Sequence, residues 1–191
     1  MSSVNAPFGL RPSYHPSGVI RPVAATITTG YASNIYLGSP VGYIADGSIA
    51  LAAAGGTGVA GACGAFQGVE YQTTAVGPRV VSNMWPASIA AVNIVAYLTV
   101  DPAILYEIQA NGSVAQTAMG AQFDWSTNDT NAGNTTTGIS NVTLNTASGA
   151  ANAGLQVMGI NKGPDNDWGD TFTVVVVRLS EHQFVATVAQ I

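Results

Sequence analysis

The chain has 191 residues, of which 47% are hydrophobic and only 8% are charged. Typical soluble domains carry about 25% charged residues, so this chain must cover its surface with Ser, Thr, Asn and Gln or bury it against partners. The hydrophobic content excludes an intrinsically disordered chain. The net charge of −5, with only five basic residues, argues against a nucleic-acid-binding surface. We therefore expect a protein that functions inside an assembly.

The sequence shows no signal for export or membrane insertion. The N-terminus lacks the basic region and apolar run of a signal peptide, and no segment reaches the ~18 apolar residues that cross a bilayer. Cys63 is the single cysteine, which excludes an internal disulfide, and we interpret it as a small buried apolar residue. We expect synthesis in the cytoplasm without export and no membrane partner.

Residues 1–22 are predicted to form an extended N-terminal arm. Four of the nine prolines fall here, too closely spaced for a helix and unable to complete the hydrogen bonds of a central strand. The arm is also rich in residue types that anchor protein contacts. His15 has no second histidine at ligand spacing, so we interpret it as an ordinary hydrogen-bonding residue. The candidate contact residues toward a partner or a neighbouring protomer are Phe8, Leu10, Arg11, Tyr14 and Arg21.

Residues 23–191 are predicted to form a single β domain. Asp46-Gly47, between two apolar runs, is the strongest hairpin signal in the chain. The segment Ala52–Gly64 is almost wholly Ala and Gly but lacks the Lys of a phosphate loop and the spacing of a dinucleotide fingerprint, so we expect packing or a turn. Trp85 is expected in the core. Early strands are expected at Val23–Thr29, Asn34–Leu37, Ala65–Gln72 and Arg79–Ser82.

The clearest β pattern lies in Ala91–Gln109. Apolar residues alternate from Val92 to Val100, stop at Asp101-Pro102 and resume from Ile104 to Ile108. Asn111-Gly112 then predicts a tight turn, since both residue types tolerate a positive φ. This stretch predicts two strands in the core of an antiparallel domain.

The last third of the chain combines a polar stretch with two strong strands. Residues 126–152 are rich in Ser, Thr, Asn and Gly with almost no large apolar side chains, which predicts a long exposed excursion. Leu155–Asn161 predicts a strand, and the β-branched run Thr171–Arg178 predicts a strand buried on both faces. Glu181–Val188 is expected as a last strand or short tail. With roughly eight to eleven strands, we predict an all-β fold, an antiparallel sandwich or barrel.

No constellation for catalysis, a cofactor or a metal is present. The two histidines have no carboxylate or nucleophile at recognisable spacing, and G-x-S-x-G, H-E-x-x-H and C-x-x-C are absent. Asp165, Asp167 and Asp170 lack the glycine and acid spacing of a calcium loop, so we expect a plain loop. A carboxylate pair for glycoside hydrolysis would have to be assembled by folding from Glu70, Glu107 and Asp124. We predict that the protein is not an enzyme.

Several phrases stand out along most of the chain: N-A-P-F-G-L-R-P (Asn5–Pro12), G-Y-A-S-N-I-Y-L-G-S-P-V (Gly30–Val41), D-G-S-I-A (Asp46–Ala50), G-V-E-Y (Gly68–Tyr71), W-P-A-S (Trp85–Ser88), D-P-A-I-L-Y-E-I-Q-A-N-G (Asp101–Gly112) and E-H-Q-F (Glu181–Phe184). Together they resemble the capsid decoration, or cement, proteins of tailed bacteriophages. The resemblance implies a virion protein on the outer surface of the head, made in the host cytoplasm and bound as a homotrimer. It implies the major capsid protein as partner and no cofactor.

Two other virion roles stay open. One is a head-fibre or adhesion module in which residues 126–152, with Trp125 and Trp168, bind host glycan. The other is a component of the tail or of the head–tail joint. For the decoration role, we expect that deletion of residues 1–22 abolishes capsid binding and leaves the β domain folded.

Overall fold

The computed structural model describes residues 2–53, 61–127, 131–150 and 153–185. Within these ranges the chain forms fifteen strands, five of them only two residues long, and one short 3-10 helix at Gln116–Ala118. The predicted all-β class is confirmed. The described strands form open antiparallel sheets, consistent with a sandwich, and they close no barrel. No helix in these ranges is long and apolar enough to cross a membrane.

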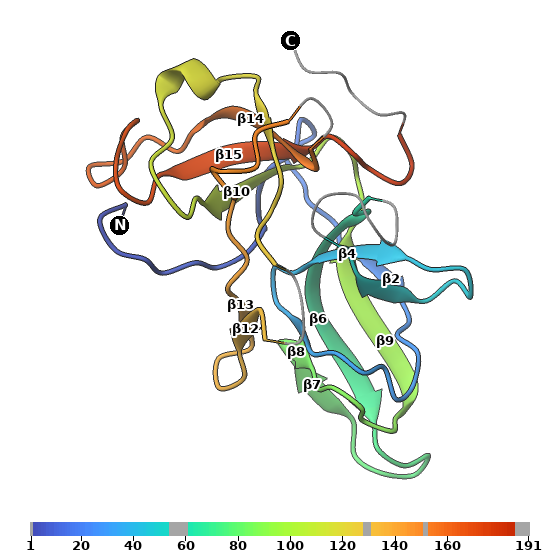
Figure 1. Cartoon of the computed structure of the whole chain (residues 1–191). Helices are drawn as coiled ribbons and strands as arrows, with labels where there is room; N and C mark the ends of the chain where they lie inside the picture. Colours follow the sequence, from blue (N-terminus) through green and yellow to red (C-terminus); the bar gives the residue numbers. More distant parts are fainter. Residues whose placement is uncertain (1, 54–60, 128–130, 151–152, 186–191) are drawn as a thin grey trace.

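Two main sheets make up the molecule and occupy different parts of it (Figure 1). The first is a five-stranded sheet with the order β1-β10-β15-β14-β11. Its strands span Arg11–Tyr14 (β1), Leu105–Gln109 (β10), Val174–Leu179 (β15), Leu155–Ile160 (β14) and Gln122–Phe123 (β11). The β-branched strand β15 is central, as its sequence predicts, with Val175 and Val177 fully buried.

The second is a six-stranded sheet with the order β2-β9-β6-β4-β5, in which β7 also pairs with β6. Its strands span Val23–Ala25 (β2), Val92–Thr99 (β9), Gly64–Gln72 (β6), Pro40–Tyr43 (β4), Ile49–Leu51 (β5) and Val80–Ser82 (β7). The Asp46-Gly47 hairpin is confirmed, since it joins β4 to β5 and Gly47 takes a φ of 81°. Two further strand pairs are Ile35–Tyr36 (β3) with Met84–Trp85 (β8), and Gly133–Asn134 (β12) with Ile139–Ser140 (β13).

The Asp101-Pro102 break carries the chain from one main sheet to the other. Strand β9 lies in the six-stranded sheet and β10 in the five-stranded sheet, so these two strands form no hairpin. The N-terminal region makes the reverse passage beside them, because β1 pairs with β10 and β2 pairs with β9. Residues 11–25 therefore supply an edge strand to each sheet, and we call them the edge ribbon.

The predicted turn at Asn111-Gly112 takes another form. Neither residue has a positive φ, because β10 is followed by a long excursion and its pairing partner is β15. The Asn111 side chain accepts a hydrogen bond from the backbone N–H of Thr146 at 3.0 Å. After β15, residues 181–185 form no strand, and His182 makes a single bridge to Ala62; residues 186–188 lie outside the described ranges.

Each main sheet has its own hydrophobic cluster. The cluster of the six-stranded sheet contains Cys63 and Trp85, both fully buried as predicted, and burial raises the pKa of the Cys63 thiol to about 12. The Ala/Gly-rich segment supplies Ala52 and Ala62 to the cluster of the five-stranded sheet. At Gly64 a Cβ would lie 1.5 Å from the Thr99 carbonyl oxygen. The expected packing role of this segment is confirmed on both sides of residues 54–60, which are not described.

The predicted exposed excursion at 126–152 is wrong for most of its described part. Val142 and Leu144 are fully buried, and Leu144 bridges to both Ala110 and Trp125. A Cβ on Gly133 would lie 2.3 Å from the Tyr36 ring, so a small residue is required there. The prediction failed because it judged burial from side-chain size, whereas this segment packs closely through its backbone and two aliphatic side chains. Only the tip at residues 134–137 is exposed, together with scattered positions on either side.

Candidate functional site

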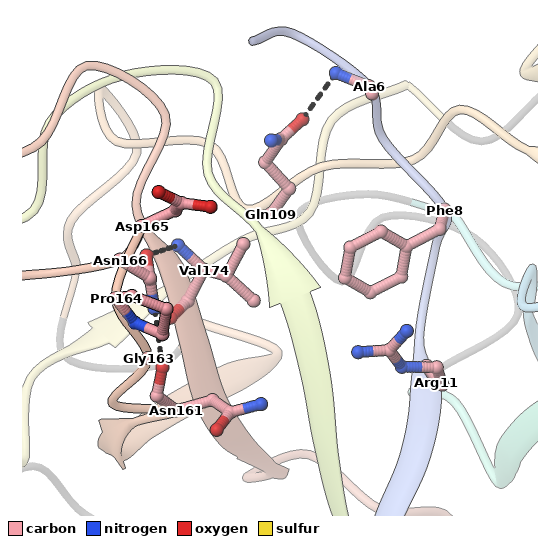
Figure 2. A pocket seen from close by; sticks show the side chains of 10 residues that line it. All are labelled: Ala6, Phe8, Arg11, Gln109, Asn161, Gly163, Pro164, Asp165, Asn166 and Val174. Atoms are coloured by element: carbon pink, nitrogen blue, oxygen red, sulfur yellow. Dashed lines mark hydrogen bonds between the residues drawn. The ribbon is translucent and has the colours of Figure 1, made fainter. Parts of the chain in front are cut away.

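The start of the arm is fastened across the end of the five-stranded sheet (Figure 2). The backbone N–H of Ser2 donates to the Asp165 carbonyl at 3.0 Å, and the Ser2 carbonyl accepts from the Phe172 N–H at 2.7 Å. The Gln109 amide accepts from the Ala6 N–H and donates to the Val4 carbonyl, both at 2.9 Å. The Gln109 side chain therefore makes the two hydrogen bonds with the arm backbone that a neighbouring strand would otherwise make.

Arg11 binds a carboxylate that lies almost entirely inside the protein. Its Nε donates to Oε2 of Glu107 at 3.0 Å, and its Nη2 also contacts that oxygen. Asn161 donates to the other carboxylate oxygen at 2.8 Å. The guanidinium carbon of Arg11 lies 4.6 Å from the centre of the Phe8 ring. Because a buried carboxylate needs a paired charge, Arg11 and Phe8 hold the arm against β10.

A pocket of about 450 Å³ lies between the arm and the loop at residues 161–166 (Figure 2). Asn166 shapes the loop side, accepting from the Val174 N–H at 2.9 Å and donating to the Asn161 carbonyl at 2.8 Å. The lining residues are Ala6, Phe8, Arg11, Gln109, Asn161, Gly163, Pro164, Asp165, Asn166 and Val174. The polar side chains around this pocket are largely engaged within the chain, so the pocket is a by-product of how the arm is fastened.

The five predicted contact residues fall into three environments. Leu10 is 0% exposed and belongs to the core of the five-stranded half, so it serves folding of this chain. Phe8 and Arg11 are brought together against β10. Tyr14 is 56% exposed, and Arg21 is also exposed. The last two lie on the edge ribbon, away from the pocket beside Phe8.

Exposed apolar side chains are concentrated on the edge ribbon and on the residues that precede it. Of the eleven large apolar residues that are exposed in the described part of the chain, four lie between residues 4 and 23: Val4, Tyr14, Val19 and Val23. Strands β1 and β2 are edge strands, paired on one side only. Proteins usually protect such edges with charge or cover, because a free edge pairs readily with another chain.

A second groove, of about 520 Å³, lies between the edge ribbon and the 100–104 crossing. His15 Nε2 lies 3.1 Å from Oδ2 of Asp101, and Oδ1 of Asp101 accepts from the Ala103 N–H at 2.9 Å. The Ala103 hydrogen bond, with a smaller contribution from His15, lowers the pKa of Asp101. The groove is lined by His15, Ser17, Val19, Arg21, Val23, Val100, Asp101, Pro102 and Ile104.

The acidic residues considered for chemistry have other roles. Glu70 binds Arg79 at 2.7 Å and the Tyr97 hydroxyl at 2.8 Å in the six-stranded half, whereas Glu107 binds Arg11 in the other half. Asp170 accepts from the Ser2 hydroxyl, which lowers the pKa of this carboxyl. In the described ranges, no group of three or more His, Cys, Asp or Glu is placed to hold a metal ion.

The sequence did not predict that the buried side chains of Glu107 and Gln109, with the exposed Asn161 beside Glu107, hold the arm in place. The alternation of β10 did place Glu107 and Gln109 on the face opposite to Ile108, and a central strand with such a face requires polar partners. This alternation was the signal that could have identified these residues. It could not show that their partner is the arm, which lies roughly a hundred residues earlier in the sequence.

The aromatic residues of the glycan-binding alternative do not form an open platform. Trp125 is only 2% exposed, and Trp168 is half-buried against the core. No family model matches the chain, and neither a curated protein nor a solved structure matches it. Its exposed apolar side chains and its two strand edges make the edge ribbon the strongest candidate functional surface among the described residues.

Proposed function

We propose that this chain is a structural protein of a tailed-phage virion, a capsid decoration protein that binds the outer surface of the head and stabilises it. Its partners are the major capsid protein and further copies of itself in a homotrimer, without a cofactor. The seven phrases quoted above support this role. So does the low charged fraction of 8%, because a lattice of neighbours covers surface that a free monomer must keep solvated.

The observation that carries the proposal is the edge ribbon. It leaves one edge of both main sheets open and presents Tyr14, Val19 and Val23 on that side of the molecule. The ribbon contains no lysine, the residue that most often blunts an edge strand, but Pro12 and the bulge between Pro12 and Tyr14 limit backbone pairing along β1. The contact is therefore proposed to run through side chains. Modest contacts of this kind become strong when several copies bind one lattice, because the linked contacts add through effective concentration.

The first test is the copy number of this chain in purified virions, measured by quantitative mass spectrometry relative to the major capsid protein. A ratio near one-to-one is expected for a decoration protein that covers the lattice. A few copies per particle would instead indicate a fibre or tail component, and absence from virions would refute the proposal.

The second test places the contact on the ribbon. The double variant Tyr14→Ser, Val19→Ser should bind undecorated heads at least about tenfold more weakly, since each truncation of an interface anchor costs on the order of 1 kcal/mol or more. The control is Val76→Ser, which is 97% exposed in the turn between β6 and β7. Equal binding of the double variant and this control would place the contact elsewhere.

Contrary to the expectation from the sequence, deletion of residues 1–22 does not separate loss of capsid binding from loss of structure. The deletion removes strand β1 and the core residue Leu10, as well as the exposed contacts. Because the deletion removes these residues, we now expect it to destabilise the five-stranded half. Loss of binding by that deletion would report loss of structure in the five-stranded half together with loss of the surface.

A further inference from the structure

We infer that the groove between the edge ribbon and the 100–104 crossing receives an acidic, otherwise apolar segment of a partner protein, and that Arg21 binds its carboxylate. The inference rests on the proposed function, because this groove lies on the proposed contact surface. It adds the chemistry of the partner. Three features of the groove support it: an unpaired cation, apolar walls and an acidic residue whose oxygens are already engaged.

Arg21 differs from the other three arginines in having no acceptor among the residues that the structure describes. Arg11 binds Glu107, Arg79 binds Glu70 at 2.7 Å, and Arg178 donates to Gln156 at 2.8 Å. In the described part of the chain, Arg21 makes neither a hydrogen bond nor an ion pair. Its guanidinium is therefore free to bind a carboxylate in the bidentate geometry that arginine favours.

The walls of the groove are largely apolar. Val19 and Val23 come from the ribbon, and Pro102 and Ile104 come from the crossing. Both valines are substantially exposed in the isolated chain. An apolar side chain seated between them would remove this surface from water, which is the usual source of affinity in an interface core.

The acid already present in the groove does not compete for Arg21. Both carboxylate oxygens of Asp101 are engaged, one by His15 and the other by the Ala103 N–H. A second carboxylate brought by a partner therefore meets a free guanidinium. The chain carries a net charge of −5, so a polyphosphate partner would be repelled by the molecule as a whole, and a single carboxylate on an apolar segment fits better.

The test uses three acetylated and amidated hexapeptides that are identical and apolar except for one central residue, Glu, Gln or Lys. Binding to the full chain is followed by NMR through the methyl groups of Val19 and Val23 and the Nε–H of Arg21. The Glu peptide is expected to bind about tenfold more tightly than the Gln peptide, the magnitude of a charge-assisted hydrogen bond, and the Lys peptide more weakly than either.

Variants assign that preference to one residue. Arg21→Gln should abolish the difference between the Glu and Gln peptides, whereas Arg21→Lys should retain part of it. The matched control is Arg79→Gln, which removes an arginine paired with Glu70 in the six-stranded half and should leave the difference intact. Equal binding of the Glu and Gln peptides to the unmodified chain, or shifts away from Val19 and Val23, would overturn the inference.

The two proposals fail in distinguishable ways. If the chain is abundant in virions but Arg21→Gln binds heads as tightly as the unmodified chain, this inference is wrong and the decoration role stands. If the chain is absent from virions but still selects the Glu peptide through Arg21, the decoration role is wrong and the acidic partner must be sought elsewhere.

Discussion

The two halves of the molecule assemble their cores from different lengths of chain. In the described part of the chain, the core of the six-stranded half comes from residues 25–100, and its strands include the β4–β5 hairpin with the Asp46-Gly47 turn. The five-stranded half collects its core from residues 10–179 and pairs Arg11 with Glu107 across the chain. Short turns join β4 to β5 and β6 to β7 in the first half, and its other pairs close within residues 23–99, whereas the second half depends on partners as distant as the arm.

The largest expected effect is that of Leu10→Ala. Leu10 is fully buried, and loss of a buried leucine costs about 2–5 kcal/mol of unfolding free energy. Urea denaturation measures the loss, and hydrogen exchange locates it. Amides of β10 and β15 should exchange faster, whereas those of the β4–β5 hairpin should not. Val4→Ala, at an exposed arm position, is the control and should stay within about 0.5 kcal/mol; equal acceleration in both halves would show that they unfold as one unit.

Val142→Ala tests the structural role of the polar 126–150 segment. The variant loses two buried methyl groups, which lowers the free energy of unfolding by about 2 kcal/mol. Amide hydrogens of the five-stranded half should again exchange faster. Thr136→Ala, at the exposed tip of the β12–β13 hairpin, is the comparison and should leave stability unchanged. Similar midpoints for the two variants in urea would mean that the segment contributes nothing to the core.

A smaller, pH-dependent effect is expected where the two halves meet. Burial lowers the pKa of His182 below its usual 6.5, and the ring accepts from the Phe184 N–H while its other nitrogen lies 3.1 Å from the Val100 carbonyl. The unfolded chain therefore takes up a proton at higher pH than the folded chain. The contribution of His182 to the free energy of unfolding should have its full value above about pH 6.5. It should decrease as the pH is lowered from there toward the pKa of His182 in the folded protein.

Urea denaturation between pH 8 and 5 measures this slope, and His182→Gln should remove its share. Hydrogen bonds with the backbone of Val100 and Cys63 and, to a smaller extent, the charge of Asp101 raise the pKa of His182 without overcoming burial. An NMR titration of the ring provides an independent check. A midpoint at or above 6.5 in the folded protein would contradict the prediction.

The smallest expected effect is the change that Leu10→Ala causes in the rate at which the Cys63 thiol of the six-stranded half is labelled. Burial raises the pKa of Cys63 to about 12, so the native thiol should react with iodoacetamide at pH 8 far more slowly than the thiol of the urea-unfolded chain. Its labelling rate reports how often this half opens. Leu10→Ala should leave that rate nearly unchanged if the halves are independent, and rapid labelling in the unmodified protein would show that the cluster around Cys63 is loose.

Sequence patterns predicted what depends on neighbours along the chain. The alternation through Ala96 and Leu98, the Asp46-Gly47 turn and the β-branched run in β15 all correspond to observed elements. They succeeded because period-2 burial and turn conformation are local properties. The assignment of β9 and β10 to different sheets could not be read from the Asp101-Pro102 break, which is equally compatible with a bend within one sheet.

Residues with long-range partners could not be placed in the same way. The Gln109 amide is indistinguishable in sequence from a solvent-exposed glutamine, and only folding brings Val4 and Ala6 to it. Leu10 was predicted as a contact toward a partner or a neighbouring protomer, which is wrong, because it is fully buried in the core of its own chain. The candidate surface was therefore predicted as a segment, and the division of its side chains between core and exposed edge came from the structure.

The edge ribbon has a consequence for the newly made protein. The ribosome synthesises Arg11 long before Leu179, the last residue of β15. At 5–20 residues per second, the interval between them is roughly 10–30 s. The six-stranded half can fold early in that time, because its core is complete at residue 100. Leu10 and β1 meanwhile have at most β10 to pair with, until β15 and β14 complete their sheet. On a crowded polysome this segment is the one most available to neighbouring nascent chains, so a chaperone that covers it during translation should raise the yield of soluble protein.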